Sequence, residues 1–288
     1  MTGDLPRQAS AYEVLAGYYD QLMDEIDYDY WCDYVLSLVE PAVACQDPVT
    51  VVAGRIRQQS AAVDQVKPLR VLDLACGTGQ FAYRLRQRGL DVTAVDVSSE
   101  MLAVAEAKTR SMDLDVRFVQ QDMRSLELPA SYDLVLCLCD SLNYLLEPDD
   151  LAAAFHNVVR VLEPGGQFVF DINTEHKLAA VYGDNTYAAD LGEYAYIWQN
   201  EYQPDTKLCY MDLTFFIPVA EIGDEGEPRQ TGLFERIMES HVQRAFSPEL
   251  VGSLLTTVGL EVLGQYDDLT LVSPKPTTER ITFHCRKP

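Results

Sequence analysis

The chain has 288 residues, of which 48% are hydrophobic, 45 are Asp or Glu and 22 are Lys or Arg. This length fits one well-filled domain with an embellishment, and the formal net charge of -23 argues against a passive electrostatic grip on nucleic acid or an anionic membrane. Seven cysteines without paired spacing and four scattered histidines favour reduced thiols, and they predict neither a disulfide framework nor a metal site.

Targeting signals are not visible in the chain. No basic N-terminal stretch precedes an apolar core, and no apolar run approaches the roughly 20 residues that span a bilayer. We therefore expect a cytoplasmic protein with no membrane partner.

The N-terminal part, residues 1–68, is predicted to be a helical lid followed by a connector. Apolar and aromatic side chains recur at helical spacing over 11–23, and a second helix is predicted over 28–40. Residues 41–68 contain three prolines around a polar stretch and are interpreted as a variable connector with no visible function.

Residues 69–173 alternate between strand-like and helix-like patterns, which is typical of a doubly wound, mostly parallel α/β sheet. The predicted strands are 69–74, 91–96, 115–120, 132–138 and 166–172, and the predicted helices are 79–89, 99–109 and 148–162.

The pattern changes after Asn173. Alternating, aromatic-rich runs with exposed turns predict antiparallel strands over 186–246, so 174–246 is interpreted as a β-rich insertion that covers the substrate. Residues 247–288 supply a last helix and a hairpin that complete the core. The expected fold is therefore a seven-stranded Rossmann-like sheet with an antiparallel terminal hairpin and an insertion.

A glycine turn follows the first predicted core strand. Residues 73–79 read Asp-Leu-Ala-Cys-Gly-Thr-Gly, and Asp96 ends the next strand. Glycines let the backbone approach a ligand, and an acid about twenty residues further on can bind a ribose diol. Because residues 77–82 also satisfy the pattern G-x-G-x-x-G/A, the turn alone would permit NAD.

Asp73 argues against a dinucleotide, because a carboxylate at this strand end repels a pyrophosphate. The same carboxylate suits S-adenosylmethionine, which carries an ammonium and a sulfonium. Asp122 ends a further strand-like run, so Asp73, Asp96 and Asp122 would lie together at the carboxyl edge of one sheet.

At these residues the chain resembles the class I S-adenosylmethionine-dependent methyltransferases, whose first motif usually reads Asp-Leu-Gly-Cys-Gly-Thr-Gly. Ala75 replaces the first glycine, a mild departure that restricts the turn slightly. Segments over nearly the whole chain are similar to a bacterial group often called YqeM-like, related in layout to amino-sugar N,N-dimethyltransferases. These segments are 12–20, 28–31, 140–144, 241–246, 266–268 and 279–281.

The resemblance implies a role for each matching residue. Ala75, Gly77 and Gly79 would approach the methionine part, Asp73 its amine and Asp96 the ribose hydroxyls. The residues implied around the adenine, at the methyl group and in the lid are Val97, Met101, Asp122 and Met123, then Cys139 and Asp140, then Tyr12 and Tyr19.

Together these observations predict methyl transfer to a nitrogen or oxygen of a small molecule, either neutral or cationic in view of the acidity of the chain. An acceptor that must lose a proton needs a general base, for which His241, Tyr19 and Asp140 are the candidates. The alternatives are an RNA or protein methyltransferase, a non-catalytic S-adenosylmethionine-binding regulator and an NAD-dependent oxidoreductase. The acceptor and a homodimer stay open.

Overall fold

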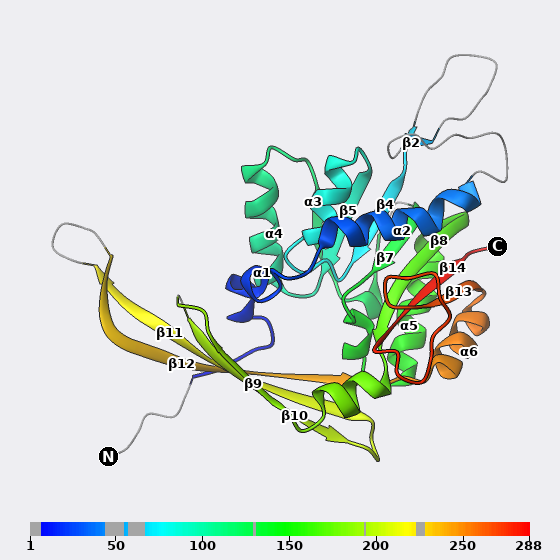
Figure 1. The fold of residues 1–288 in the computed structure, drawn as a ribbon. Helices are drawn as coiled ribbons and strands as arrows, with labels where there is room; N and C mark the ends of the chain where they lie inside the picture. The colour runs from blue at the N-terminus through cyan, green and yellow to red at the C-terminus, as the bar shows by residue number, and fades with distance from the viewer. Residues whose placement is uncertain (1–6, 44–54, 57–66, 129–130, 193, 223–227) are drawn as a thin grey trace.

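The computed structural model describes residues 7–43, 55–56, 67–128, 131–192, 194–222 and 228–288. The connector predicted over 41–68 falls largely outside these residues, apart from the end of one helix and two short strands, β2 (Arg55–Ile56) and β3 (Lys67–Pro68). A seven-stranded sheet forms the centre of the fold, and a second, five-stranded sheet extends beside it (Figure 1).

The central sheet confirms the predicted doubly wound arrangement. Its order is β13-β14-β8-β7-β4-β5-β6, so the chain runs outward from β4 to β6 and then resumes on the other side of β4. A crevice for ligands forms at the carboxyl ends of the strands at such a reversal. The parallel strands are β4 (Arg70–Leu74), β5 (Asp91–Asp96), β6 (Arg117–Gln120), β7 (Tyr132–Cys137) and β8 (Leu162–Asn173), and the antiparallel pair is β13 (Glu261–Asp267) and β14 (Arg280–Arg286).

Helices cover both faces of this sheet (Figure 1). Side chains alternate along β4, so that Val71 packs toward one helical layer and Leu72 toward the other, and both are fully buried. The first layer holds α2 (Tyr28–Val43), α3 (Gln80–Gln87) and α4 (Ser99–Ser111), and the second holds α5 (Pro148–Val161) and α6 (Pro248–Val258). None of the helices in the described ranges is long and apolar enough to span a bilayer.

The insertion forms the five-stranded sheet, in the order β1-β12-β11-β10-β9, and confirms the predicted antiparallel strands. Its edge strand β1 (Arg7–Ala9) comes from the N-terminus, pairs in parallel with β12 and was not predicted. The remaining strands are β9 (Thr186–Asp190), β10 (Ala195–Gln203), β11 (Leu208–Ile222) and β12 (Pro228–Arg244).

The N-terminal segment, residues 7–23, packs on the five-stranded sheet but is not the continuous helix predicted over 11–23. Only η1 (Leu15–Gly17) and α1 (Tyr19–Leu22) are helical. The prediction is wrong because the backbone bonds elsewhere: Tyr12 has a φ of 64°, and the amides of Tyr12 and Leu15 donate to the Glu239 carboxylate on β12. That partner is more than 220 residues away in the chain.

Candidate active site

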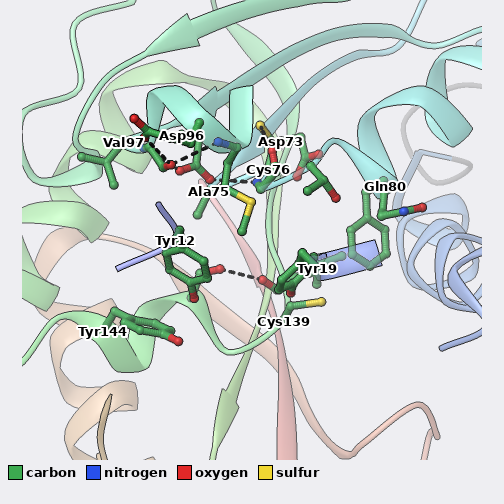
Figure 2. A pocket seen from close by; sticks show the side chains of 18 of the residues that line it. Tyr12, Tyr19, Asp73, Ala75, Cys76, Gln80, Asp96, Val97, Cys139 and Tyr144 are labelled. Atoms are coloured by element: carbon green, nitrogen blue, oxygen red, sulfur yellow. Dashed lines mark hydrogen bonds between the residues drawn. The ribbon is translucent and has the colours of Figure 1, made fainter. Parts of the chain in front are cut away.

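A cavity of about 420 Å³ lies at the carboxyl ends of β4, β5 and β7, where the strand order reverses. The glycine turn forms one wall and the N-terminal segment covers the opposite side (Figure 2). We refer to it as the cofactor cavity. Its lining is Ala11, Tyr12, Tyr19, Tyr28, Asp73, Ala75, Cys76, Gly77, Thr78, Gln80, Phe81, Asp96, Val97, Ser98, Ser99, Glu100, Met101, Met123, Leu138, Cys139, Ser141 and Tyr144.

Asp73 ends β4 beneath the turn and is 1% exposed. A hydrogen bond from the Ala82 amide stabilises its carboxylate, whereas Oδ2 has no partner among the described residues. Burial, with a contribution from the negative Asp96 nearby, raises the pKa of Asp73 to about 7. An unpartnered carboxylate oxygen in a cavity is a site for a cationic hydrogen-bond donor.

Asp96 ends β5 and holds the turn against the strand. Its Oδ2 accepts from the Gly77 amide at 2.8 Å and its Oδ1 from the Ser98 amide at 2.9 Å. The Val97 amide also bonds to this carboxylate. Because a carboxylate has about four lone-pair sites, Asp96 can still accept from a hydroxyl group of a ligand. Ala75 and Gly77 both have positive φ, 60° and 53°, and a Cβ on Gly77 would meet nothing within 4 Å, so this backbone borders open space.

The structure places ten of the thirteen predicted cofactor residues in the lining of this cavity. Gly79 lies behind it, where a Cβ would stand 3.0 Å from Ala105. Asp122 does not line it either, because its carboxylate faces Arg124 at 2.6 Å. Asp140 lines the neighbouring cavity instead. The ten are Tyr12, Tyr19, Asp73, Ala75, Gly77, Asp96, Val97, Met101, Met123 and Cys139.

A second cavity of about 280 Å³ lies between the N-terminal segment and the five-stranded sheet. We refer to it as the acceptor cavity. It shares Tyr12, Tyr19, Cys139 and Tyr144 with the cofactor cavity, so these side chains lie between the two spaces. Its other residues are Leu15, Leu22, Met23, Ile26, Asp140, Lys177, Tyr182, Tyr196, Trp198, Met211, Leu213, His241, Gln243 and Arg280.

Arg280, on β14, joins two carboxylates beside the acceptor cavity. Its guanidinium contacts Asp171 Oδ2 at 2.8 Å and Asp140 Oδ1 at 2.9 Å, and Gln243 donates to Asp140 Oδ2 at 2.6 Å. Burial raises the pKa of Asp171 to about 6, although Arg280 opposes this. Because both Asp140 oxygens already accept hydrogen bonds, Asp140 is poorly placed as a general base.

Sequence reasoning missed Arg280, Gln243 and Asp171 as site residues. Asp171 had a signal, since it is an acid near the end of the fifth core strand, as Asp73 and Asp96 are near the ends of the first and second. Arg280 and Gln243 lie in segments that carry the family resemblance, but one charged or amide residue in an alternating strand does not show which face it occupies.

The two remaining base candidates differ in environment. Burial raises the pKa of Tyr19 well above its usual range, so its phenol stays neutral and cannot act as a base at neutral pH. His241 is 4% exposed and lines the acceptor cavity, with Nδ1 3.5 Å from the Tyr144 hydroxyl and Nε2 3.4 Å from Glu239.

A second contact fixes the N-terminal segment over the glycine turn. Asp20 Oδ1 accepts from the Thr78 hydroxyl at 2.6 Å, and Asp20 Oδ2 pairs with Lys108 Nζ at 2.6 Å. Lys108 also donates to the Thr78 carbonyl at 2.9 Å. The glycine turn, α4 and the N-terminal segment are therefore joined by one small polar cluster.

Comparison with known proteins identifies the family. The family described as "Methyltransferase domain" matches residues 71–166. The putative methyltransferase YqeM of Bacillus subtilis is 32% identical over 278 residues, which cover 96% of this chain and 97% of that protein. The chain belongs to the YqeM-like S-adenosylmethionine-dependent methyltransferases. A crystal structure of an S-adenosylmethionine-dependent methyltransferase from Clostridium acetobutylicum matches this methyltransferase with a TM-score of 0.76 and 31% identity, over 96% of this chain and 98% of that one.

This membership confirms the predicted cofactor and enzyme class and sets aside the NAD-dependent alternative. The cofactor cavity of this methyltransferase fits S-adenosylmethionine, because the unpartnered Asp73 Oδ2 is available to an ammonium group and the Asp96 carboxylate to a ribose hydroxyl. No group of three or more His, Cys, Asp and Glu side chains in the described part of the chain is arranged to hold a metal ion.

Proposed function

We propose that this methyltransferase transfers a methyl group to a nitrogen or oxygen atom of a small molecule bound in the acceptor cavity. The observation that carries the proposal is the pair of adjoining cavities whose linings have Tyr12, Tyr19, Cys139 and Tyr144 in common. The acceptor cavity's volume of about 280 Å³ is close to the lower end of the range of small-molecule pockets, which begins at roughly 300 Å³, so the cavity suits a small acceptor.

The proposed cofactor contacts follow from the lining. Asp73 binds the ammonium group and Asp96 the ribose hydroxyls, while Val97, Met101 and Met123 flank the adenine. Tyr12 and Tyr19 cover the cofactor from the N-terminal segment. Asp122 is left out, because Arg124 already occupies its carboxylate.

The proposed reaction is an in-line displacement. S-adenosylmethionine, when bound, supplies a methyl group already activated on a sulfonium sulfur, so the protein mainly aligns the acceptor and excludes water. The shared tyrosines and Cys139 border the point where the two cavities meet. An amine acceptor has to be deprotonated and a hydroxyl acceptor needs a base, for which His241 is the best-placed of the three candidates.

The wider proposals concern acceptor class and setting. The net charge of -23 supports a neutral or cationic acceptor and disfavours RNA. We place the enzyme in the cytoplasm and assign 1–68 as the lid and connector, 69–173 and 247–288 as the core, and 174–246 as the acceptor cover. A homodimer remains a hypothesis.

The test is incubation of the enzyme and methyl-labelled S-adenosylmethionine with a whole-cell extract, followed by separation into small-molecule, RNA and protein fractions and mass spectrometry of every species that gains the label. We expect a small molecule to be labelled by the wild-type enzyme and not by Asp96→Ala. Label in RNA or protein alone would refute the proposed acceptor class, and label transferred to no fraction would support a regulator.

A further inference from the structure

The Glu239 carboxylate, on β12, is fully buried and holds the N-terminal segment in place. It accepts from the amide of Tyr12 at 3.1 Å, from that of Leu15 at 2.9 Å, and from that of Val14. Three convergent amide donors stabilise an ionised carboxylate, as an anion-binding nest does. The turn at residues 12–15, which covers both cavities, is therefore anchored on the Glu239 carboxylate.

The same carboxylate faces His241, two residues along β12. Glu239 Oε2 lies 3.4 Å from His241 Nε2, a contact too poorly aligned for a hydrogen bond, and Nε2 has no other partner among the described residues. Even without that alignment, a carboxylate oxygen 3.4 Å away disfavours the electron density of a lone pair on Nε2 and favours an N–H there, so the neutral ring carries its proton on Nε2.

This assignment leaves the lone pair of His241 on Nδ1, on the side of the acceptor cavity. The Tyr144 hydroxyl lies 3.5 Å from Nδ1, and the Tyr12 ring packs edge to face on the imidazole with centroids 4.8 Å apart. Tyr12 and Tyr144 both border the cofactor cavity. The basic nitrogen is thus oriented toward the junction of the two cavities.

We infer that Glu239 is a positioning residue that couples closure of the N-terminal segment to the tautomer of His241, with the proton on Nε2 and the basic lone pair on Nδ1. The inference rests on the proposed transfer to a small acceptor. As the acceptor atom bonds to the methyl carbon, the carbon–sulfur bond breaks and the sulfur leaves as a neutral thioether. The acceptor proton passes to Nδ1, and the Glu239 carboxylate stabilises the resulting imidazolium through Nε2–H.

The tautomer can be measured without knowing the acceptor. We expect ¹⁵N NMR of imidazole-labelled enzyme saturated with S-adenosylhomocysteine to show His241, assigned by the signal missing in His241→Gln, as neutral with Nε2 protonated. A proton on Nδ1 in the wild-type enzyme would overturn the inference. Because this measurement involves no acceptor, it tests the His241 tautomer independently of the labelling experiment, which tests the proposed function.

Glu239→Gln tests the coupling. An amide keeps one acceptor oxygen for the N-terminal segment but directs an N–H₂ group at His241 Nε2, so we expect the proton to move to Nδ1. We also expect faster hydrogen exchange over residues 12–15. Glu235→Gln, an exposed position on the same strand, is the matched control and should change neither signal. An unchanged His241 tautomer in folded Glu239→Gln would refute the coupling. If that variant does not fold, the measurement on the wild-type enzyme still determines the tautomer.

Discussion

Asp73→Asn should stabilise the cofactor-free enzyme while weakening cofactor binding. Folding moves the pKa of Asp73 from 3.8 to about 7, so the protonated form is favoured in the folded state. Relative to a permanently ionised group, Asp73 contributes its full stabilisation of the folded protein below pH 3.8. This stabilisation is lost as the pH rises through about 7. At pH 8 the ionised carboxylate therefore destabilises the cofactor-free protein by about 4 kcal/mol.

The substitution removes that charge but leaves a buried amide N–H₂ in its place, which costs about 1–3 kcal/mol when unpaired. We expect a net gain of roughly 1–3 kcal/mol at pH 8, or roughly 2–5 °C in Tm for a chain of this length. At pH 4 the gain should disappear, because Asp73 is then neutral in the folded wild-type protein.

Cofactor binding should change in the opposite direction. Loss of one charge-assisted hydrogen bond to the ammonium group, worth about 1.5–3 kcal/mol, weakens binding of S-adenosylhomocysteine by roughly 10- to 150-fold. Urea unfolding of the cofactor-free protein and titration calorimetry measure the two effects, with the exposed Asp91→Asn as charge control. A variant no more stable than wild type at pH 8, or one of unchanged affinity, would refute this account of Asp73.

Three further substitutions test the turn and the lid. Asp96→Ala leaves the Gly77 and Ser98 amides without their acceptor and removes the ribose contact, so calorimetry should show an affinity loss of about 100-fold or more; unchanged affinity would contradict the strand-end arrangement. Gly79→Ala forces a side chain into a φ of 75° against Ala105, so urea unfolding should show a loss of about 1–3 kcal/mol, and a stable variant would disprove the close approach. Asp20→Asn breaks the pair with Lys108, so hydrogen exchange over 12–22 should accelerate; unaltered protection there would show that Asp20 does not hold the segment.

The core was predictable because its determinants are local. Buried strands such as Arg70–Leu74 read as apolar runs, and the turn that follows needs small residues at positive φ. Chain reversal then brings Asp73 and Asp96 to one edge whatever the rest of the chain does. The sequence alone was therefore sufficient to predict these two residues and the cavity lining near them.

The acceptor side was not predictable, because its determinants are distant in the chain. The expected N-terminal helix does not form because its amides bond to Glu239, more than 220 residues away in the chain. No local pattern in the sequence distinguishes Glu239 from exposed acids such as Glu235 on the same strand. Asp122 ends its strand as predicted, yet a neighbour two residues along, Arg124, takes its carboxylate. Pairing partners of this kind are decided only when the chain is folded.

The five-stranded sheet supplies walls of the acceptor cavity, including Tyr196, Trp198 and His241, whereas no described residue of 174–246 lines the cofactor cavity. Under the proposed function, substitutions in the sheet would change which molecule is methylated while the residues around the methyl donor stay the same. For enzyme engineering, this division makes the inner face of β10 and β11 the first place to randomise.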